Sequence, residues 1–173
     1  VPCDVRPSNR GMATLSLGAR KFLPNLNSAV HVDYRLYGDT WDVLSHTFDV
    51  DYYQNFAPSA AFFTKNDIDF QVVPGIRYYQ QSKAFFYEIP NVNESSGAVY
   101  TTGTTTFYSS DPRLSHYGAL SVKLKVKADI KQFSLVGLVE RYAANPKYGF
   151  NADDETPGLP GFWRLTTGLN FRF

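Results

Sequence analysis

The strongest constraint on the fold is a strict alternation of apolar and polar side chains in the second half of the chain. Within residues 117–127, one apolar set alternates with one polar set: Leu120, Val122, Leu124 and Val126 with Ser121, Lys123, Lys125 and Lys127. A period of two places the two sets on opposite faces of an extended strand. This segment is therefore predicted to be a β-strand with one apolar and one polar face.

Further segments alternate in the same way, and turn-forming residues separate them. We predict strands at residues 12–23, 28–37, 44–55, 69–81, 132–142 and 162–173. The segment 132–142 is apolar on both sides, so its orientation is left open. Pro74 lacks a ladder donor, which favours a β-bulge with Gly75. Since no segment keeps a helical period, residues 1–173 are predicted to form one all-β, antiparallel domain.

Composition narrows the class of protein. The chain is 43% hydrophobic and 16% aromatic, with 14 Phe and 12 Tyr, yet its mean hydropathy is −0.29. This combination suits half-polar strands, and no run approaches the roughly 18 apolar residues of a membrane-spanning helix. A net charge of +1 without a Lys/Arg-rich run argues against binding to nucleic acid. Cys3 is the single cysteine, interpreted as a free or buried thiol, with pairing to a thiol outside this segment as the alternative.

Three features favour a bacterial outer-membrane barrel over a soluble sandwich. Most predicted connections alternate between short and long, as periplasmic turns and external loops do, although 38–43 and 56–68 break that pattern. Aromatic residues gather near strand ends, as in membrane girdles. The last strand ends at Phe173 with Leu169 and Phe171 at alternating positions before it, which resembles the signal read by the barrel-assembly machinery. We therefore expect a transmembrane antiparallel up-and-down β-barrel in the outer membrane, in contact with lipid, lipopolysaccharide and that machinery.

The strand count leads to an expectation about the rest of the barrel. If Phe173 lies in the periplasm, seven strands place Val1 outside the cell. Bacterial single-chain barrels have an even number of strands and both termini inside. We therefore expect these seven strands to be the C-terminal part of a larger barrel, with its N-terminal strands upstream.

Several stretches resemble the C-terminal half of an uncharacterised family of Gram-negative outer-membrane proteins, catalogued as a domain of unknown function. The matching stretches are Arg6-Pro7-Ser8-Asn9-Arg10, Ala29 to Trp41, Ser45-His46-Thr47, Tyr52-Tyr53-Gln54, Arg77-Tyr78-Tyr79-Gln80-Gln81-Ser82, Ala84-Phe85-Phe86-Tyr87 and Tyr108-Ser109-Ser110-Asp111-Pro112-Arg113-Leu114-Ser115. The resemblance covers most of the chain. It implies an outer-membrane barrel longer than this segment, and it implies no particular activity.

The polar face of strands 28–37 and 44–55 carries the main candidate residues. Their hairpin places Asp33 opposite Asp49 and His31 opposite Asp51. Directly opposed like charges destabilise a sheet unless a cation neutralises them, and Arg77 on the next strand is predicted to reach Asp49. The full set predicted to line the lumen is His31, Asp33, Arg35, Asp49, Asp51, Arg77, Lys123, Lys125, Arg164 and Arg172.

Three interpretations of this polar face are open. It is a salt-bridge network that braces the barrel interior, a cation-selective constriction formed by the carboxylates, or a catalytic His–Asp pair. The basic residues of the later strands, set against the acidic hairpin, also suggest a transverse field across a pore. No nucleophile or oxyanion hole can be assigned, so no catalytic residue is named and the chain is not expected to be an enzyme.

The long polar connection before residue 117 ends in a second candidate set, Ser109, Ser110, Asp111 and Arg113. These residues are predicted to cap the next strand, to fold inward as a plug, or to contact a partner. The acidic patch at residues 151–155 matches no known calcium loop. The histidines are scattered and no cofactor motif occurs, so neither a metal nor a cofactor is expected.

The sequence as a whole predicts a porin-like channel for small polar solutes or ions. The alternative is a non-conducting barrel that anchors or sheathes an envelope partner, such as an electron-transfer protein. A channel needs an open lumen, whereas an anchor can be plugged and should present a contact surface on its long loop.

Overall fold

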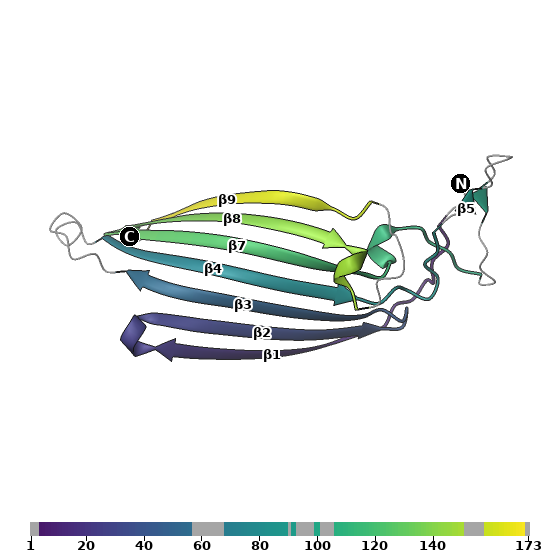
Figure 1. Cartoon of the computed structure of the whole chain (residues 1–173), viewed down its shortest axis with the longest axis horizontal. Helices are drawn as coiled ribbons and strands as arrows, with labels where there is room; N and C mark the ends of the chain where they lie inside the picture. Colours follow the sequence, from purple (N-terminus) through teal and green to yellow (C-terminus); the bar gives the residue numbers. More distant parts are fainter. Residues whose placement is uncertain are drawn as a thin grey trace.

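In the computed structural model, residues 4–56, 68–89, 91–92, 99–100, 106–150 and 158–171 are described. Seven long strands form one sheet in the order β1-β2-β3-β4-β7-β8-β9 (Figure 1). They are β1 (Met12–Leu23), β2 (Ser28–Asp39), β3 (Leu44–Phe56), β4 (Ile68–Gln81), β7 (Tyr117–Ile130), β8 (Phe133–Asn145) and β9 (Gly161–Phe171). A separate ladder joins β5 (Asn91–Val92) to β6 (Val99–Tyr100). Each long strand pairs antiparallel with its sequence neighbour in the sheet, so the all-β, antiparallel prediction is confirmed.

The predicted strand positions agree closely with the observed ones. The largest differences are at the ends of β7 and β8, which extend to Ile130 and Asn145 rather than to 127 and 142. The helical elements in the described ranges are three short 3-10 turns, at Pro24–Leu26, Pro112–Leu114 and Pro146–Tyr148. No helix in this part of the chain is long and apolar enough to cross a membrane.

Local turn chemistry closes the hairpins. Between β1 and β2, Pro24 opens the 3-10 turn and the backbone N–H of Asn27 donates to its carbonyl oxygen at 3.1 Å. Asn27 adopts a positive φ of 47°, a conformation that asparagine tolerates better than most residues. The tight connection between β7 and β8 similarly places Lys131 at a φ of 51°.

The register between β2 and β3 is the one predicted. His31 lies opposite Asp51 and Asp33 opposite Asp49, as the hairpin argument required. The bulge expected near Pro74 is absent, because the pairs on either side of it keep one register, from Ser45↔Gln81 to Phe56↔Phe70. Pro74 removes one donor from the ladder with β3, but β4 stays in step because it pairs with β7 along its whole length.

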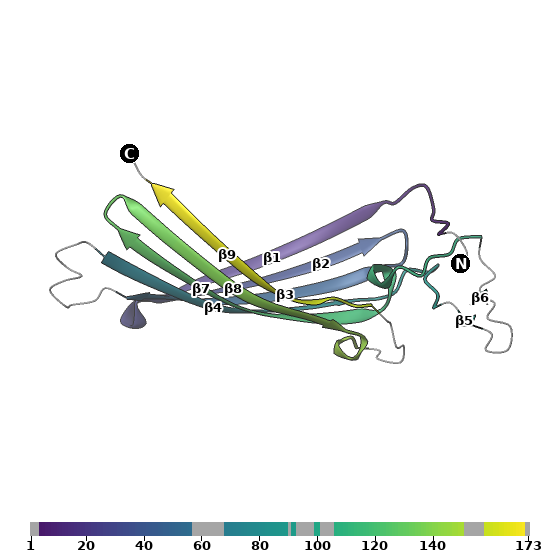
Figure 2. The same ribbon diagram turned by 90° about the horizontal axis from the view of Figure 1, so that it is seen from above.

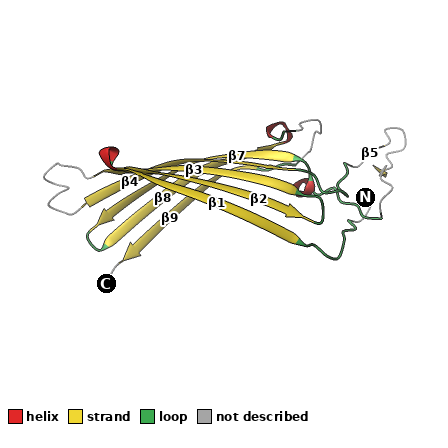
Figure 3. Ribbon diagram, turned by 90° about the horizontal axis from the view of Figure 1, so that it is seen from below, coloured by secondary structure: helices red, strands yellow, loops and turns green. Residues whose placement is uncertain are grey.

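The sheet curls so that its two faces differ in environment. In Figures 2 and 3 the edge strands β1 and β9 lie on the same side of the middle strands, so the sheet forms a trough. The polar face lies inside the curve and holds buried polar groups, among them Asp49, Ser121 and Glu140. The convex face is apolar and exposed. Its exposed residues include Leu15, Leu17, Val50, Ile76, Val122, Leu124, Leu135, Val139, Trp163, Leu165 and Leu169.

The sheet is open at both edges. Strands β1 and β9 end the strand order, and neither has a second partner within the described residues. Because the pairing is antiparallel at every step, β1 and β9 run in the same direction. The structure thus shows an up-and-down sheet of seven strands, and not a closed barrel.

The loops at one end of the sheet lie beside the N-terminal segment (Figure 1), and they contain a small hydrophobic core. We call residues 4–11, 40–43, 82–89 and 106–116 the cap. Its buried cluster consists of Val43, Ala84, Phe86, Tyr87 and Leu114, against which Tyr37, Trp41 and Phe107 pack. Isolated bridges pair Val5 with Tyr108 and Tyr87 with Ser109, so segments distant in sequence meet in the cap.

Candidate functional site: a charged trough and a folded cap

The trough holds a cavity of about 760 Å³ to which every long strand contributes lining residues. Its polar lining includes Asp33, Arg35, Asp49, Asp51, Arg77, Lys123, Glu140 and Arg164. Lys125 lines an adjoining cavity of about 180 Å³. His31 shares the same face through its pairing with Asp51. The structure therefore brings together all predicted lumen residues that it describes, while Arg172 lies outside the described residues.

The centre of the trough is a cluster of two carboxylates and two cations. Nε of Arg77 lies 2.5 Å from Oδ2 of Asp49, which confirms the predicted contact between these residues. Nζ of Lys123 lies 3.0 Å from Oδ1 of Asp49 and 2.9 Å from Oδ1 of Asp51. Lys123 thus neutralises both acids of β3 from β7, across the intervening strand β4.

Lys123 reaches Asp51 across β4 because residue 75 of that strand is a glycine. By register, Gly75 of β4 lies directly between Asp51 of β3 and Lys123 of β7. A Cβ at this position would run into the Asp51 carboxylate and the Lys123 side chain. The missing side chain opens the space in which the two charged groups meet.

Two further ion pairs flank this centre. Nη2 of Arg20 lies 2.9 and 2.8 Å from the two carboxylate oxygens of Asp33. Arg164 of β9 pairs with Glu140 of β8, whose residue exposure is only 7%. Every carboxylate that lines the two cavities therefore has a cationic partner.

Two cations of the trough have no carboxylate partner in the described part of the chain: Arg35 and Lys125. Arg35 is exposed and lies between Ser16 and Thr47 in the paired strands. Lys125 rests over the ring of Tyr53, with Nζ 5.2 Å from the ring centroid. The polar face thus carries more unpaired positive than unpaired negative charge.

His31 does not form the pair expected of a catalytic base. Its ring stacks against Tyr53 with centroids 4.2 Å apart. No hydrogen bond joins His31 to Asp51 among the residues that the structure describes. In the same ranges, no group of three or more His, Cys, Asp or Glu residues could hold a metal ion.

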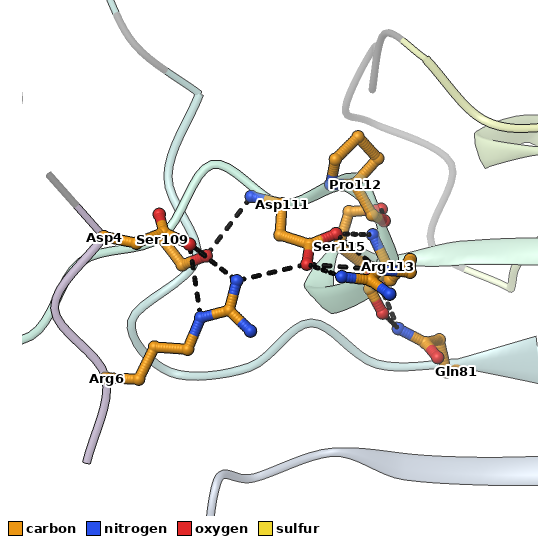
Figure 4. A network of polar contacts seen from close by, with 8 residues as sticks. All are labelled: Asp4, Arg6, Gln81, Ser109, Asp111, Pro112, Arg113 and Ser115. Atoms are coloured by element: carbon orange, nitrogen blue, oxygen red, sulfur yellow. Dashed lines mark hydrogen bonds and ion pairs between the residues drawn. The ribbon is translucent and has the colours of Figure 1, made fainter. Parts of the chain in front are cut away.

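The cap is held by a polar network that includes most of the predicted loop-contact residues (Figure 4). Nη2 of Arg6 lies 2.6 Å from Asp4 and 3.1 Å from Asp111, and Arg113 lies 2.7 Å from Asp111. Oγ of Ser109 donates to Asp4 at 3.1 Å and is fully buried. Asp111 and Ser109 therefore join the loop to the N-terminal segment. Arg113 presents its side chain outward, 81% exposed.

The cap is also fastened to the sheet. Arg10 lies over the ring of Trp41, with Cζ 4.3 Å from the centroid, and pairs with Asp39 of β2 at 2.5 Å. Asp39 in turn accepts hydrogen bonds from the backbone N–H groups of Trp41 and Val43. Gln81 of β4 donates to the carbonyl oxygens of Arg113 and Ser115 at 2.9 and 2.7 Å. Trp41 therefore reports on the packing of the cap against the strands.

Comparison with protein families agrees with the resemblance seen in the sequence. Residues 1–171 match the family described as "Protein of unknown function (DUF3570)". The chain belongs to this family. No curated protein and no solved structure matches it. The expected membership in an uncharacterised family is confirmed, and the family description names neither an activity nor a cellular location.

Sequence reasoning missed Glu140, which lines the cavity, and Arg20, which pairs with the lining residue Asp33. The turn at residues 24–27 sets the register of β1 against β2, and that register would have placed Arg20 beside Asp33. Glu140 was missed because the predicted strand 132–142 is apolar on both faces, so the alternation of residue types did not show which face of the strand is polar. The signal for Glu140 lies in the neighbouring strands, since it pairs with Lys123 on one side and Arg164 on the other.

The cap is expected to resist acid down to a low pH. Hydrogen bonding to Arg113 lowers the pKa of Asp111 to about 2 from its ordinary value of 3.8. A carboxyl whose pKa is depressed by folding stabilises the folded state above its unfolded pKa, and that contribution is lost as pH falls through the folded value. Trp41 fluorescence, read in a variant of the full-length protein in which Trp163 and every other tryptophan except Trp41 is replaced by phenylalanine, should stay constant from pH 7 to about pH 4 and change between about pH 4 and pH 2.

The matched control for this titration is Asp111→Asn, whose side-chain amide takes up no proton between pH 7 and pH 2. It should loosen the cap already at pH 7 and reduce the acid transition. A transition of the parent protein centred above pH 5 would contradict the role given to Asp111.

Proposed function

We propose that this chain forms part of the wall of an outer-membrane β-barrel whose polar lumen passes small polar solutes or ions. The observation that carries the proposal is the inverted burial of the sheet. Leu165 and Leu169 on the convex face are 76% and 68% exposed, whereas Asp49 and Glu140 on the concave face are 9% and 7% exposed. A sheet in water buries its apolar face, because removing apolar surface from water is the main driving force of folding.

A bilayer resolves this inversion. Hydrocarbon is the natural environment for the convex face, and a water-filled lumen suits the concave one. The strands also have the right length, since each long strand has 11 to 14 residues and a tilted strand needs about 9–11 to cross. The outer-face charges fit as well: of the strand residues on this face, only Lys21 and Arg141 are charged, and Arg141 lies beside Trp163 at 5.6 Å from its ring centroid.

Aromatic side chains near both ends of the convex face support the same orientation. Toward the cap, the ring of Tyr78, near the end of β4, lies 6.4 Å from that of Phe150. At the opposite end, the ring of Phe133 lies 4.9 Å from that of Phe171. Aromatic belts of this kind mark the two membrane–water interfaces of outer-membrane barrels.

The open edges call for additional strands. Unpaired backbone groups are not tolerated in hydrocarbon, so a membrane sheet has to close on itself. Because β1 and β9 run in the same direction, antiparallel closure requires an odd number of strands between them, whichever chain supplies those strands. Seven strands plus an odd number give an even total, as bacterial barrels have.

The direct test is the conductance of the full-length protein in a planar bilayer. We expect stable single-channel steps once the protein has inserted. Migration on a gel with and without heating shows independently whether the protein is folded. A silent bilayer with folded protein would contradict the channel function.

The cap favours a second candidate, a non-conducting barrel that anchors an envelope partner. The loops at this end are folded around their own core, and Arg113 projects from them. A rigid loop surface of this kind suits protein contact. This candidate would be preferred if the folded protein stayed silent in the bilayer.

A further inference from the structure

We infer that the trough prefers anions, so that the solutes it passes are small molecules carrying carboxylate or phosphate groups. This inference rests on the proposed function, because it assigns a charge preference to the same lumen. It is opposed to one of the three interpretations of the polar face, the cation-selective constriction formed by the carboxylates.

The carboxylates that line the two cavities are not free to attract cations, and of the strand acids on the polar face only Asp69, at the end of β4 away from the cap, has no cationic partner among the described residues. Asp49 and Asp51 share Lys123, and Asp49 also pairs with Arg77. The remaining two acids that line the cavities, Asp33 and Glu140, pair with Arg20 and Arg164. A close ion pair acts on a distant solute as a dipole, and its field falls off faster with distance than that of a single charge.

Arg35 is placed to bind an anion. It has no carboxylate partner among the described residues, and it is exposed within the cavity. Its paired neighbours across the strands, Ser16 and Thr47, line the same cavity and carry hydroxyl groups. A guanidinium offers forked N–H donors that match carboxylate and phosphate oxygens, and hydroxyl groups add further donors.

Lys125 supplies a second unpaired cation at another depth. Arg35 lies opposite Thr47, on the cap side of the Asp49–Asp51 cluster, whereas Lys125 follows Lys123 along β7 away from the cap. The Tyr53 ring beneath Lys125 holds the ammonium without neutralising it. An anion that moves along the trough therefore meets a positive charge on each side of the neutral centre, and a cation is repelled at both.

The test is ion selectivity of the full-length protein in a planar bilayer under a potassium chloride gradient. The reversal potential gives the ratio of chloride to potassium permeability. We expect chloride to be preferred, and Arg35→Gln and Lys125→Gln each to lower the ratio about sevenfold, because one charge roughly 7 Å from an ion in water changes the permeability of chloride and that of potassium about threefold in opposite directions. Lys21→Gln is the matched control, because it removes the same charge from the convex face next to Arg20 and should leave the ratio unchanged.

The possible outcomes separate the inference from the proposed function. One outcome is that the variants conduct while Arg35→Gln and Lys125→Gln change the ratio of chloride to potassium permeability no more than Lys21→Gln does. That result would overturn the anion preference and leave the channel function intact. So would a parent channel that prefers potassium. A silent bilayer with folded protein would overturn the channel, and the anion preference with it.

Discussion

Replacing Lys123 with methionine is expected to lower the free energy of unfolding by about 2–4 kcal/mol, since removing one partner of a buried ion pair leaves an uncompensated charge. The side chains of Asp49 and Asp51 are only 12% and 19% exposed. Without Lys123, two carboxylates that are neighbours on one face of β3 would share the Arg77 guanidinium alone. The value is set somewhat below that of a fully buried pair, because the trough is open to water.

The measurement is a denaturant titration of the full-length protein in lipid vesicles, followed by tryptophan fluorescence. Lys125→Met is the matched control, because Lys125 is the next residue on the same face of β7 and has no carboxylate partner in the described ranges. The Lys125→Met substitution should lower the free energy of unfolding by less than about 1 kcal/mol, which is the usual contribution of an exposed cation–π contact. Adding Asp51→Asn to Lys123→Met should recover part of the stability. Equal effects of Lys123→Met and Lys125→Met would show that the central cluster does not stabilise the sheet.

Gly75→Ala is expected to destabilise the sheet by about 1–3 kcal/mol, the usual cost of inserting a methyl group into a filled space. The new Cβ would occupy the crossing between Asp51 and Lys123 and force the two side chains apart. In a strand, alanine loses less backbone freedom on folding than glycine does, so the backbone change alone would stabilise the sheet. Any loss of stability therefore comes from the space between Asp51 and Lys123 that the new methyl group fills.

Gly137→Ala is the control for this substitution. Gly137 lies within β8, and a Cβ there would meet nothing within 4 Å. It should therefore leave the unfolding free energy unchanged or raise it slightly. A double variant gives a sharper test: in a Lys123→Ala background, Gly75→Ala should cost much less, because the Lys123 side chain that the new methyl group would meet is gone and the Asp51 carboxylate is free to turn away. Additive effects of the two substitutions would refute the proposed role of Gly75.

Much of the strand architecture was accessible from sequence. Alternation located the strands, and the predicted hairpin between residues 28 and 55 correctly placed Asp33 opposite Asp49. The same reasoning anticipated the contact of Arg77 with Asp49, because these residues lie on adjacent strands. It was wrong at Pro74, where we expected a bulge and found an unbroken register. Pairing of β4 with β7 over its whole length outweighs one missing hydrogen bond.

The charged trough was predicted only in part. The residues of its polar face were assigned from alternation, but most of their partners were not. Arg20 required the register of β1, and Glu140 lies in a strand with no polarity pattern of its own. Arg35 was placed beside the acidic hairpin, yet it forms no ion pair within the described residues. Only the observed pairs therefore show that the unpaired charges lining the cavities, those of Arg35 and Lys125, are positive.

Local sequence was enough to define which residues form strands, which side chains share a face, and how the strands of a hairpin are aligned. These properties follow from the two-residue period of an extended chain and from short turns such as the one at residues 24–27. Only the tertiary structure placed the polar face inside the curve of the sheet, formed the cap at one end, and let Lys123 reach Asp51 across Gly75. Those features depend on contacts between segments far apart in the chain and on space left by a missing side chain, which no local pattern encodes.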